Sequence, residues 1–149
     1  MSDIEKRRAM LELARTASGG RGFLTATRER ELVEKGVLGL GLAPFEAAGL
    51  IAAGADAHGI ALETQLERTL DKLVEAAADK RRRLRRDRFR ELVAYAQSLS
   101  NGALGATKAQ EKVKRAAERC GVVPRAAGLL RSTRWYRRSG ASRAEPGEA

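Results

Sequence analysis

Apolar residues spaced three or four positions apart are the feature that most limits how this chain can fold. Leu62, Leu66, Leu70, Leu73 and Ala77 fall on one face of a helix, and charged residues occupy the opposite face. Aromatic residues make up only 4% of the chain, so small aliphatic side chains must build the core. Because sheet proteins rely on aromatic and β-branched residues, the sequence predicts an all-α fold, a compact bundle of about six or seven helices.

Capping residues and glycines mark where these helices begin and end. Ser2 and Glu5 have the spacing of a capping box, Thr25 or Thr27 can cap a helix, and Pro44 is suited to the first helical position. The expected helices cover residues 3–17, a segment that follows the threonine cap and fades over 36–41, and residues 45–57, 62–77, 89–99 and 107–120. A capping box is expected at 107–110, and Pro124 is expected to open a short helix. Residues 62–99 form either one long helix or two helices with a bend near 80–83.

The length of the chain sets its domain organisation. A chain of 149 residues has room for one domain of the usual size, so we expect a single helical domain over residues 1–139. Glycines at 19–22 predict a hinge that lets residues 1–22 move as an arm. Residues 140–149 lack apolar periodicity and are predicted to be a disordered tail.

Two segments of the chain repeat. Residues 28–33 and 88–93 are identical at five of six positions, at an offset of 60. At an offset of 62 a second set of small and apolar residues matches: Ala47, Ile51, Ala55, Gly59 and Ile60 correspond to Ala109, Val113, Ala117, Gly121 and Val122. The two matches predict a pair of repeated helical hairpins, which could bury each other's apolar faces. Chance agreement in a chain rich in Arg, Ala and Leu is the alternative.

The second hairpin consists of an apolar helix over residues 92–99, a turn at Asn101 and Gly102, and a helix over 109–121. It resembles the repeat unit of TerB-like helical domains, which occur in tellurite-resistance proteins and in the N-terminal parts of some membrane-linked co-chaperones. The resemblance covers about residues 24–125 and implies a helical fold. Lys108 and Gln110 stand where the family places acidic residues, so the cation binding of the family does not carry over to this chain.

Positive charge is concentrated in the second half of the chain. Residues 1–79 carry 10 Lys/Arg and 13 Asp/Glu, a net charge of −3, whereas residues 80–149 carry 19 Lys/Arg and 6 Asp/Glu, a net charge of +13. Two clusters stand out, one over residues 80–90 and one over 131–138. The candidate binding residues are Arg81, Arg82, Arg83, Arg85, Arg86, Arg88, Arg90, Arg131, Arg134, Trp135, Tyr136, Arg137 and Arg138.

Guanidinium groups bind phosphates in a planar, bidentate manner and displace condensed counterions from nucleic acids. The sequence therefore predicts a non-enzymatic protein that binds DNA or RNA through an arginine-rich helix and a basic C-terminal segment. A TerB-like adaptor that docks an acidic protein partner is the alternative, and an anionic membrane surface or a simple solvated face are further ones. Trp135 and Tyr136 either stack on bases or anchor the C-terminus to the core, with the anchor favoured.

The chain offers little for catalysis or metal binding. His58 is the only histidine and Cys120 the only cysteine, so no zinc site, no disulfide and no cofactor is expected. His58 is interpreted as a capping or packed residue and Cys120 as a buried structural thiol rather than a nucleophile. A single cysteine fits a reducing cytoplasm, so the protein is expected to be cytoplasmic. Without an apolar stretch of about 20 residues, no membrane span is expected.

Overall fold

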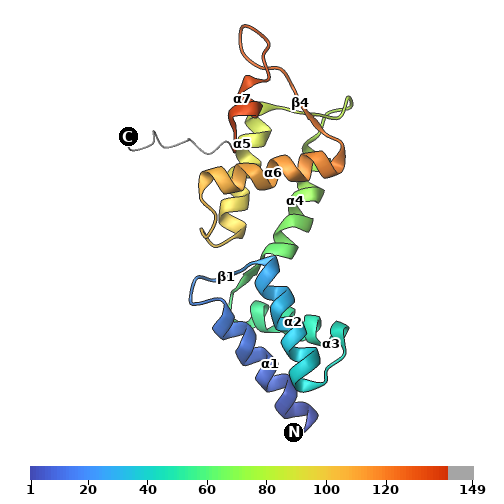
Figure 1. Cartoon of the computed structure of the whole chain (residues 1–149). Coiled ribbons are helices and arrows are strands. Elements are labelled where there is room, and N and C mark those ends of the chain that lie inside the picture. The colour runs from blue at the N-terminus through green and yellow to red at the C-terminus, as the bar shows by residue number, and fades with distance from the viewer. Residues whose placement is uncertain (141–149) are drawn as a thin grey trace, which may run out of the picture. The chain divides into compact units, whose positions relative to one another are not determined.

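The structure is a computed structural model that describes residues 1–140. Over these residues the chain forms seven helices and four strands of two residues each, which confirms the all-α prediction. The chain divides into two compact units (Figure 1): unit 1 comprises Met1–Leu66 and Leu99–Ala103, and unit 2 comprises Glu67–Ser98 and the chain from Leu104 onward. The single domain predicted for residues 1–139 stays a prediction. Of the predicted tail at 140–149, all but Gly140 lies outside the described residues.

Unit 1 is built from three helices around a small parallel strand pair. It contains α1 (Asp3–Ala17), β1 (Phe23–Leu24), α2 (Ala26–Leu40), α3 (Pro44–Ala57), β2 (Ala61–Leu62) and the start of α4 (Glu63–Ala77). The capping box of α1 is confirmed, because the Ser2 hydroxyl accepts from the Glu5 N–H and the Glu5 carboxylate accepts from the Ser2 N–H. Thr25 caps α2, as expected, and Pro44 is the first residue of α3.

The core of unit 1 lies between α1, α2 and α3. Its members are Met10, Ala14, Leu24, Leu32, Leu42, Ala47, Ile51, Ala55, Ile60 and Leu62. Strand β1 pairs with β2 in parallel, with Leu24 opposite Leu62, and this pairing carries both leucines into the core. If α1 moved as the predicted arm, Met10 and Ala14 would become exposed to water. The free-energy cost of that movement would rise with the apolar area that they expose.

Unit 2 repeats this arrangement. It contains the rest of α4, β3 (Arg83–Leu84), α5 (Arg86–Leu99), α6 (Ala106–Cys120), β4 (Val123–Pro124) and α7 (Arg134–Arg138). Strand β3 pairs with β4 in parallel, with Leu84 opposite Pro124. The buried apolar residues of this unit are Leu70, Val74, Leu84, Phe89, Leu92, Val93, Ala96, Leu104, Ala109, Val113, Ala116, Ala117 and Val122.

The predicted repeat of two helical hairpins is present, and it is longer than the sequence match. Helices α2 and α3 correspond to α5 and α6, and α1 corresponds to α4 at the same offset of 60. Equivalent positions are buried in both copies, including Met10 with Leu70, Leu24 with Leu84, Leu32 with Leu92, Ala47 with Ala109 and Ile51 with Val113. Chance agreement does not explain matched burial over a whole unit.

The structure decides one open alternative and corrects two local expectations. Residues 62–99 form two helices, and β3 separates them because the chain must extend at residues 83–84 to pair with β4. Helix α6 begins at Ala106 behind an N-cap at Gly105 that makes no side-chain hydrogen bond, so the capping box predicted at 107–110 is wrong. The helix predicted to open at Pro124 is also wrong. Pro124 lies in β4, which pairs with β3: the N–H of the next residue, Arg125, donates to the backbone carbonyl of Leu84 at 2.8 Å.

Candidate nucleic-acid interface

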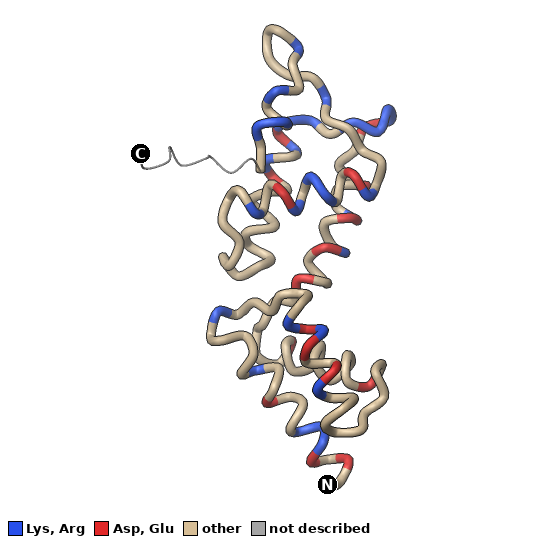
Figure 2. The backbone as a smooth tube through the Cα atoms, in the orientation of Figure 1, with Lys and Arg blue, Asp and Glu red and all other residues tan. Residues whose placement is uncertain are grey.

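The arginine run of residues 81–90 does not form one helix. Arg81 and Arg82 lie in a turn, Arg83 in β3 and Arg85 directly before α5, so only Arg86, Arg88 and Arg90 are helical. The expectation of an arginine-rich helix is therefore corrected to a turn, a strand and the first turns of α5. Figure 2 shows how the basic residues gather along this segment and along α7.

Four arginines of the run are held by carboxylates of unit 2. Their ion pairs are Arg82 with Glu75 at 2.6 Å, Arg83 with Asp79 at 3.1 Å, Arg85 with Asp87 at 3.1 Å and Arg88 with Glu91 at 3.0 Å. Their positive charge is partly neutralised, so they contribute less to an anion site than the sequence suggests.

Arg82 has a structural role that the sequence did not reveal. Its backbone has φ = 58°, in the left-handed region, and its repeat equivalent in unit 1 is Gly22 at φ = 65°. Its guanidinium also donates to the backbone carbonyl of Cys120, the last residue of α6. The hydrogen bond from Arg82 lowers the pKa of the Glu75 carboxyl below its ordinary value.

Replacement of Arg82 by glycine, the residue type found in unit 1, should release the Glu75 carboxyl. A carboxyl with a lowered pKa stabilises the fold above its unfolded pKa, and this contribution is lost as the pH falls through its folded pKa. We therefore expect the Glu75 pKa to rise toward its ordinary value in Arg82→Gly, with a weaker loss of stability in acid. NMR titration of the Glu75 side-chain carboxyl carbon measures this change in pKa. Arg88→Gly serves as the control and should leave the Glu75 pKa in place.

Two arginines of the run, Arg86 and Arg90, line a groove and form no ion pair with a carboxylate of the described residues. Arg86 and Arg90 lie one helical turn apart on α5, and they line a groove together with Arg85, Asp87 and the segment Arg125–Ala127 after β4. Four arginines against one aspartate give this groove a net charge of +3. Asp87 is already paired with Arg85 at 3.1 Å, which leaves Arg86, Arg90 and Arg125 as the cations that face the groove.

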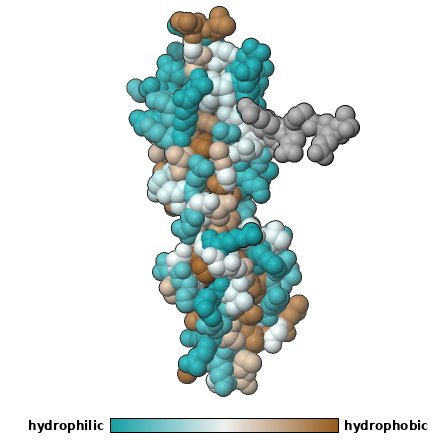
Figure 3. Space-filling model, turned by 90° about the vertical axis from the view of Figure 1, so that its left-hand side faces the viewer, coloured by the Kyte–Doolittle hydropathy of each residue, from teal (hydrophilic) through white to brown (hydrophobic). Residues whose placement is uncertain are grey.

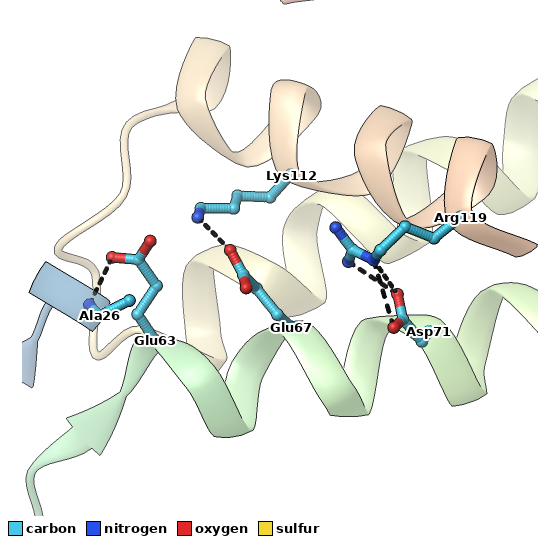
Figure 4. A network of polar contacts seen from close by, with 6 residues as sticks. All are labelled: Ala26, Glu63, Glu67, Asp71, Lys112 and Arg119. Carbon is cyan, nitrogen blue, oxygen red and sulfur yellow. Dashed lines mark hydrogen bonds and ion pairs between the residues drawn. The ribbon is translucent and has the colours of Figure 1, made fainter. Parts of the chain in front are cut away.

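The repeat shows what occupies the same place in unit 1. There the first turn of α2 receives two acceptors: the Thr25 hydroxyl accepts from the Arg28 N–H at 3.3 Å, and the Glu63 carboxylate accepts from the Ala26 N–H at 3.4 Å. Both acceptors satisfy orphan N–H groups at the positive end of the helix dipole. The carboxylate of Glu63 thus acts as an anion built into unit 1 (Figure 4).

In unit 2 this built-in anion is replaced by cations. Thr25 corresponds to Arg85 at the offset of 60, Ala26 corresponds to Arg86, and Glu63 corresponds to Arg125 at the offset of 62. A guanidinium cannot accept a hydrogen bond. The positive end of α5 therefore has Arg85 and Arg125 where α2 has a hydroxyl and a carboxylate, and an external anion could accept hydrogen bonds from both the helix N–H groups and the guanidinium groups.

The remaining carboxylates of α4 are engaged with α6. Glu67 accepts from Lys112 at 2.6 Å, and Asp71 accepts three hydrogen bonds from Arg119, the shortest at 2.7 Å (Figure 4). These pairs tie α4 to α6 within unit 2. They also remove Lys112 and Arg119 from the cations available to a ligand.

Trp135 and Tyr136 form an aromatic cluster with Phe89. All three ring pairs are edge to face, with centroids 5.3–5.6 Å apart, and Phe89 is 2% exposed. The Trp135 indole N–H donates to the carbonyl of Arg125 at 3.2 Å, and burial raises the pKa of the Tyr136 hydroxyl. This packing supports the interpretation of both rings as an anchor, and it connects α7 to the groove through the backbone of Arg125.

The basic residues of the C-terminal cluster lie around this anchor. Arg131 is in the loop before α7, and Arg134, Arg137 and Arg138 are exposed on α7. Arg137 lines a separate groove with Lys114, Arg115 and the carboxylates of Glu111 and Glu118. Asp and Glu are absent from residues 119–140, so Arg125, Arg131 and Arg134 have no acidic sequence neighbour.

Sequence reasoning missed Arg125. It is an isolated arginine between Pro124 and two alanines, outside both clusters, and only the pairing of β3 with β4 brings it to α5. The repeat carried a signal, because its equivalent in unit 1 is an acid, Glu63. The two copies of the unit therefore carry opposite charges at this position.

The other reactive side chains have structural surroundings. His58 is the exposed C-cap residue of α3. Cys120 is partly buried, its thiol lies 3.5 Å from the Asp71 carbonyl, and burial raises its pKa, which lowers its nucleophilicity at neutral pH. Within residues 1–140, no three His, Cys, Asp or Glu side chains come together as a metal site.

No known protein family, curated protein or solved structure matches this chain. The resemblance to TerB-like domains therefore stays a prediction from residues 92–121. Among the helices of the described residues, none has the length and apolar character needed to cross a membrane.

Proposed function

We propose that this protein binds nucleic acid without catalysis, through phosphates held in the groove between α5 and the segment after β4. Arg86, Arg90 and Arg125 bind the phosphates, and the first N–H groups of α5 complete the site. The exposed arginines of α7, together with Arg131, extend the positive surface along the backbone of the ligand. The observation that carries this proposal is the exchange of Glu63 in unit 1 for Arg125 in unit 2.

Arginine favours a phosphate over a carboxylate ligand here for two reasons. Its planar guanidinium offers paired N–H groups that match phosphate oxygens, and a phosphodiester chain presents a series of such groups at regular spacing. The cations of the groove and of α7 are spread over one unit, so a polyanion can contact several of them at once. Each contact releases counterions, so the affinity must fall steeply with salt.

The Arg125→Glu variant tests the proposal by restoring the arrangement of unit 1. A carboxylate at this position should accept from the first turn of α5 and stabilise the protein at low salt by about 0.3–1 kcal/mol. The same variant should bind labelled DNA or RNA on the order of tenfold more weakly, because it fills the anion site from within. Thermal unfolding and fluorescence anisotropy at several salt concentrations measure the two effects.

The combination of higher stability and weaker binding is diagnostic, because a damaged fold would lower both. Arg21→Glu, at an exposed arginine in unit 1, is the charge-matched control and should leave the affinity nearly unchanged. An affinity unchanged by Arg125→Glu would contradict the proposal. Capture of an acidic protein that survives nuclease treatment, with no salt-sensitive binding to nucleic acid, would favour the adaptor alternative.

A further inference from the structure

The loop between β4 and α7 carries two exposed leucines. Leu129 is 106% exposed and Leu130 is 91% exposed, and they follow each other at the tip of the loop. We call residues 127–132 the leucine loop. In Figure 3 an apolar patch at the top of the view is bordered by hydrophilic surface. A contiguous exposed apolar patch with a polar rim is typical of an interaction site.

The leucine loop is braced at its base. Ala127 and Ser132 exchange both backbone hydrogen bonds at 3.0 Å, and the Arg131 N–H donates to the Gly128 carbonyl at 3.1 Å. Gly128 has φ = 82°, a conformation that favours glycine. The loop thus has the backbone pairing of a short hairpin, and both leucines at its tip are exposed.

The base of this loop is also a wall of the cationic groove. Ala126 and Ala127 line the groove with Arg86 and Arg90, and the loop leaves directly from this wall. Arg125 precedes the loop and Arg131 lies within it. A ligand whose phosphates occupy the groove therefore lies against the base of the leucine loop, and in the sequence an arginine stands on either side of the two leucines.

We propose that Leu129 and Leu130 insert between stacked base pairs of duplex DNA from the minor groove and kink the duplex. This inference rests on the proposed nucleic-acid binding and names its substrate class. Aliphatic side chains flanked by arginines are the wedges by which minor-groove proteins unstack a base step. The phosphates on either side of the opened step then meet Arg125 and Arg131.

Single-stranded nucleic acid and a membrane fit these observations less well. Single strands are bound by stacking on exposed aromatic faces, whereas Trp135 and Tyr136 make edge contacts with Phe89 and the exposed Tyr95 does not line the groove. Two leucine side chains bury less apolar area than a single acyl chain, which by itself anchors a protein only marginally. Duplex RNA has a wide, shallow minor groove in which an inserted side chain makes few contacts, so we expect the protein to bind B-form DNA in preference to duplex RNA.

The test compares the whole protein with a double variant, Leu129→Ser/Leu130→Ser. The control is Leu38→Ser/Phe45→Ser, which removes two exposed apolar side chains, 86% and 90% exposed, from unit 1. A short DNA duplex carries 2-aminopurine at one step and a donor–acceptor dye pair at its ends. Fluorescence of 2-aminopurine reports unstacking, energy transfer reports bending, and anisotropy reports affinity.

Wild type and the control variant should raise the 2-aminopurine fluorescence severalfold and shorten the distance between the duplex ends. The double variant should do neither, and it should bind the duplex on the order of tenfold more weakly with an unchanged salt slope. Salt-sensitive binding without unstacking in wild type would overturn the wedge and leave the proposed function in place. Equal or tighter binding to a single strand of the same sequence would also overturn it.

Failure of the proposed function gives a different result. If the wild-type protein shows no salt-sensitive binding to duplex DNA, single-stranded DNA or RNA, both proposals are contradicted. Sedimentation with vesicles of phosphatidylglycerol provides the membrane arm, and leucine-dependent sedimentation without duplex binding would assign the loop to a lipid surface and contradict the wedge.

Discussion

The double variant Arg86→Glu/Arg90→Glu is expected to bind nucleic acid on the order of 100-fold more weakly than wild type at moderate salt. Both side chains line the cationic groove of unit 2, one helical turn apart on α5, where the only aspartate of the groove is paired with Arg85. Reversal of two charges removes two phosphate contacts and adds repulsion. The slope of log affinity against log salt should therefore fall by about 2 in magnitude.

The choice of these two residues follows from the structure. Arg82 and Arg86 belong to the run that the sequence emphasises, but the Arg82 side chain bonds Glu75 and the Cys120 carbonyl, and its reversal would disturb the fold. The double variant therefore combines Arg86 with Arg90 instead of Arg82. Arg8→Glu/Arg30→Glu is the matched control, with the same change in net charge on exposed residues of unit 1 and with Arg30 at the repeat position of Arg90.

Anisotropy titrations at several salt concentrations, with circular dichroism to show that each variant folds, measure the outcome. An equal loss of affinity in both double variants would mean that net charge alone, and not the groove, attracts the ligand. Full affinity in Arg86→Glu/Arg90→Glu would reject the groove as the binding surface.

Leu84→Ala should lower the free energy of unfolding by about 2–5 kcal/mol. Leu84 is 0% exposed and lies in β3, where the pairing with β4 fixes its backbone, so neighbouring side chains can fill the cavity only in part. Its repeat equivalent, Leu24, is 1% exposed in β1, and Leu24→Ala should have a cost in the same range.

Chemical denaturation followed by two signals measures this effect. Trp135 is the only tryptophan and contacts Phe89 in unit 2, so its fluorescence reports unit 2, whereas circular dichroism reports every helix. The single domain predicted for residues 1–139 requires Leu24→Ala to shift both signals together, and a shift confined to circular dichroism would contradict it. Leu38→Ala, at an exposed leucine, is the control and should change the stability by less than about 0.5 kcal/mol.

Much of the fold could be predicted from local signals. The helix over residues 3–17 has its predicted bounds, because the capping box at Ser2 and the apolar spacing both act within a few residues. The short strands could not be predicted in this way. Two residues carry no periodicity, and a strand such as β1 exists only because β2, far along the chain, lies beside it.

The candidate site was only partly predictable for the same reason. Charge composition points to unit 2, where all the predicted binding residues lie. Composition cannot show which arginines form ion pairs. Arg82, for example, pairs with Glu75 because a turn of the chain brings the two side chains together. Composition also cannot show that Arg125 joins Arg86, since their contact depends on the pairing of β3 with β4.

By itself the sequence determined the helices, most of their ends, the repeated hairpins and the half of the chain that carries the positive charge, because these properties depend on the order of neighbouring residues. The tertiary structure alone decided which cations line the groove beside α5 and that the Glu63 carboxylate reaches the first turn of α2. Charge pairing acts through space, so residues that are distant in sequence decide whether an arginine is already neutralised or is available to an anion.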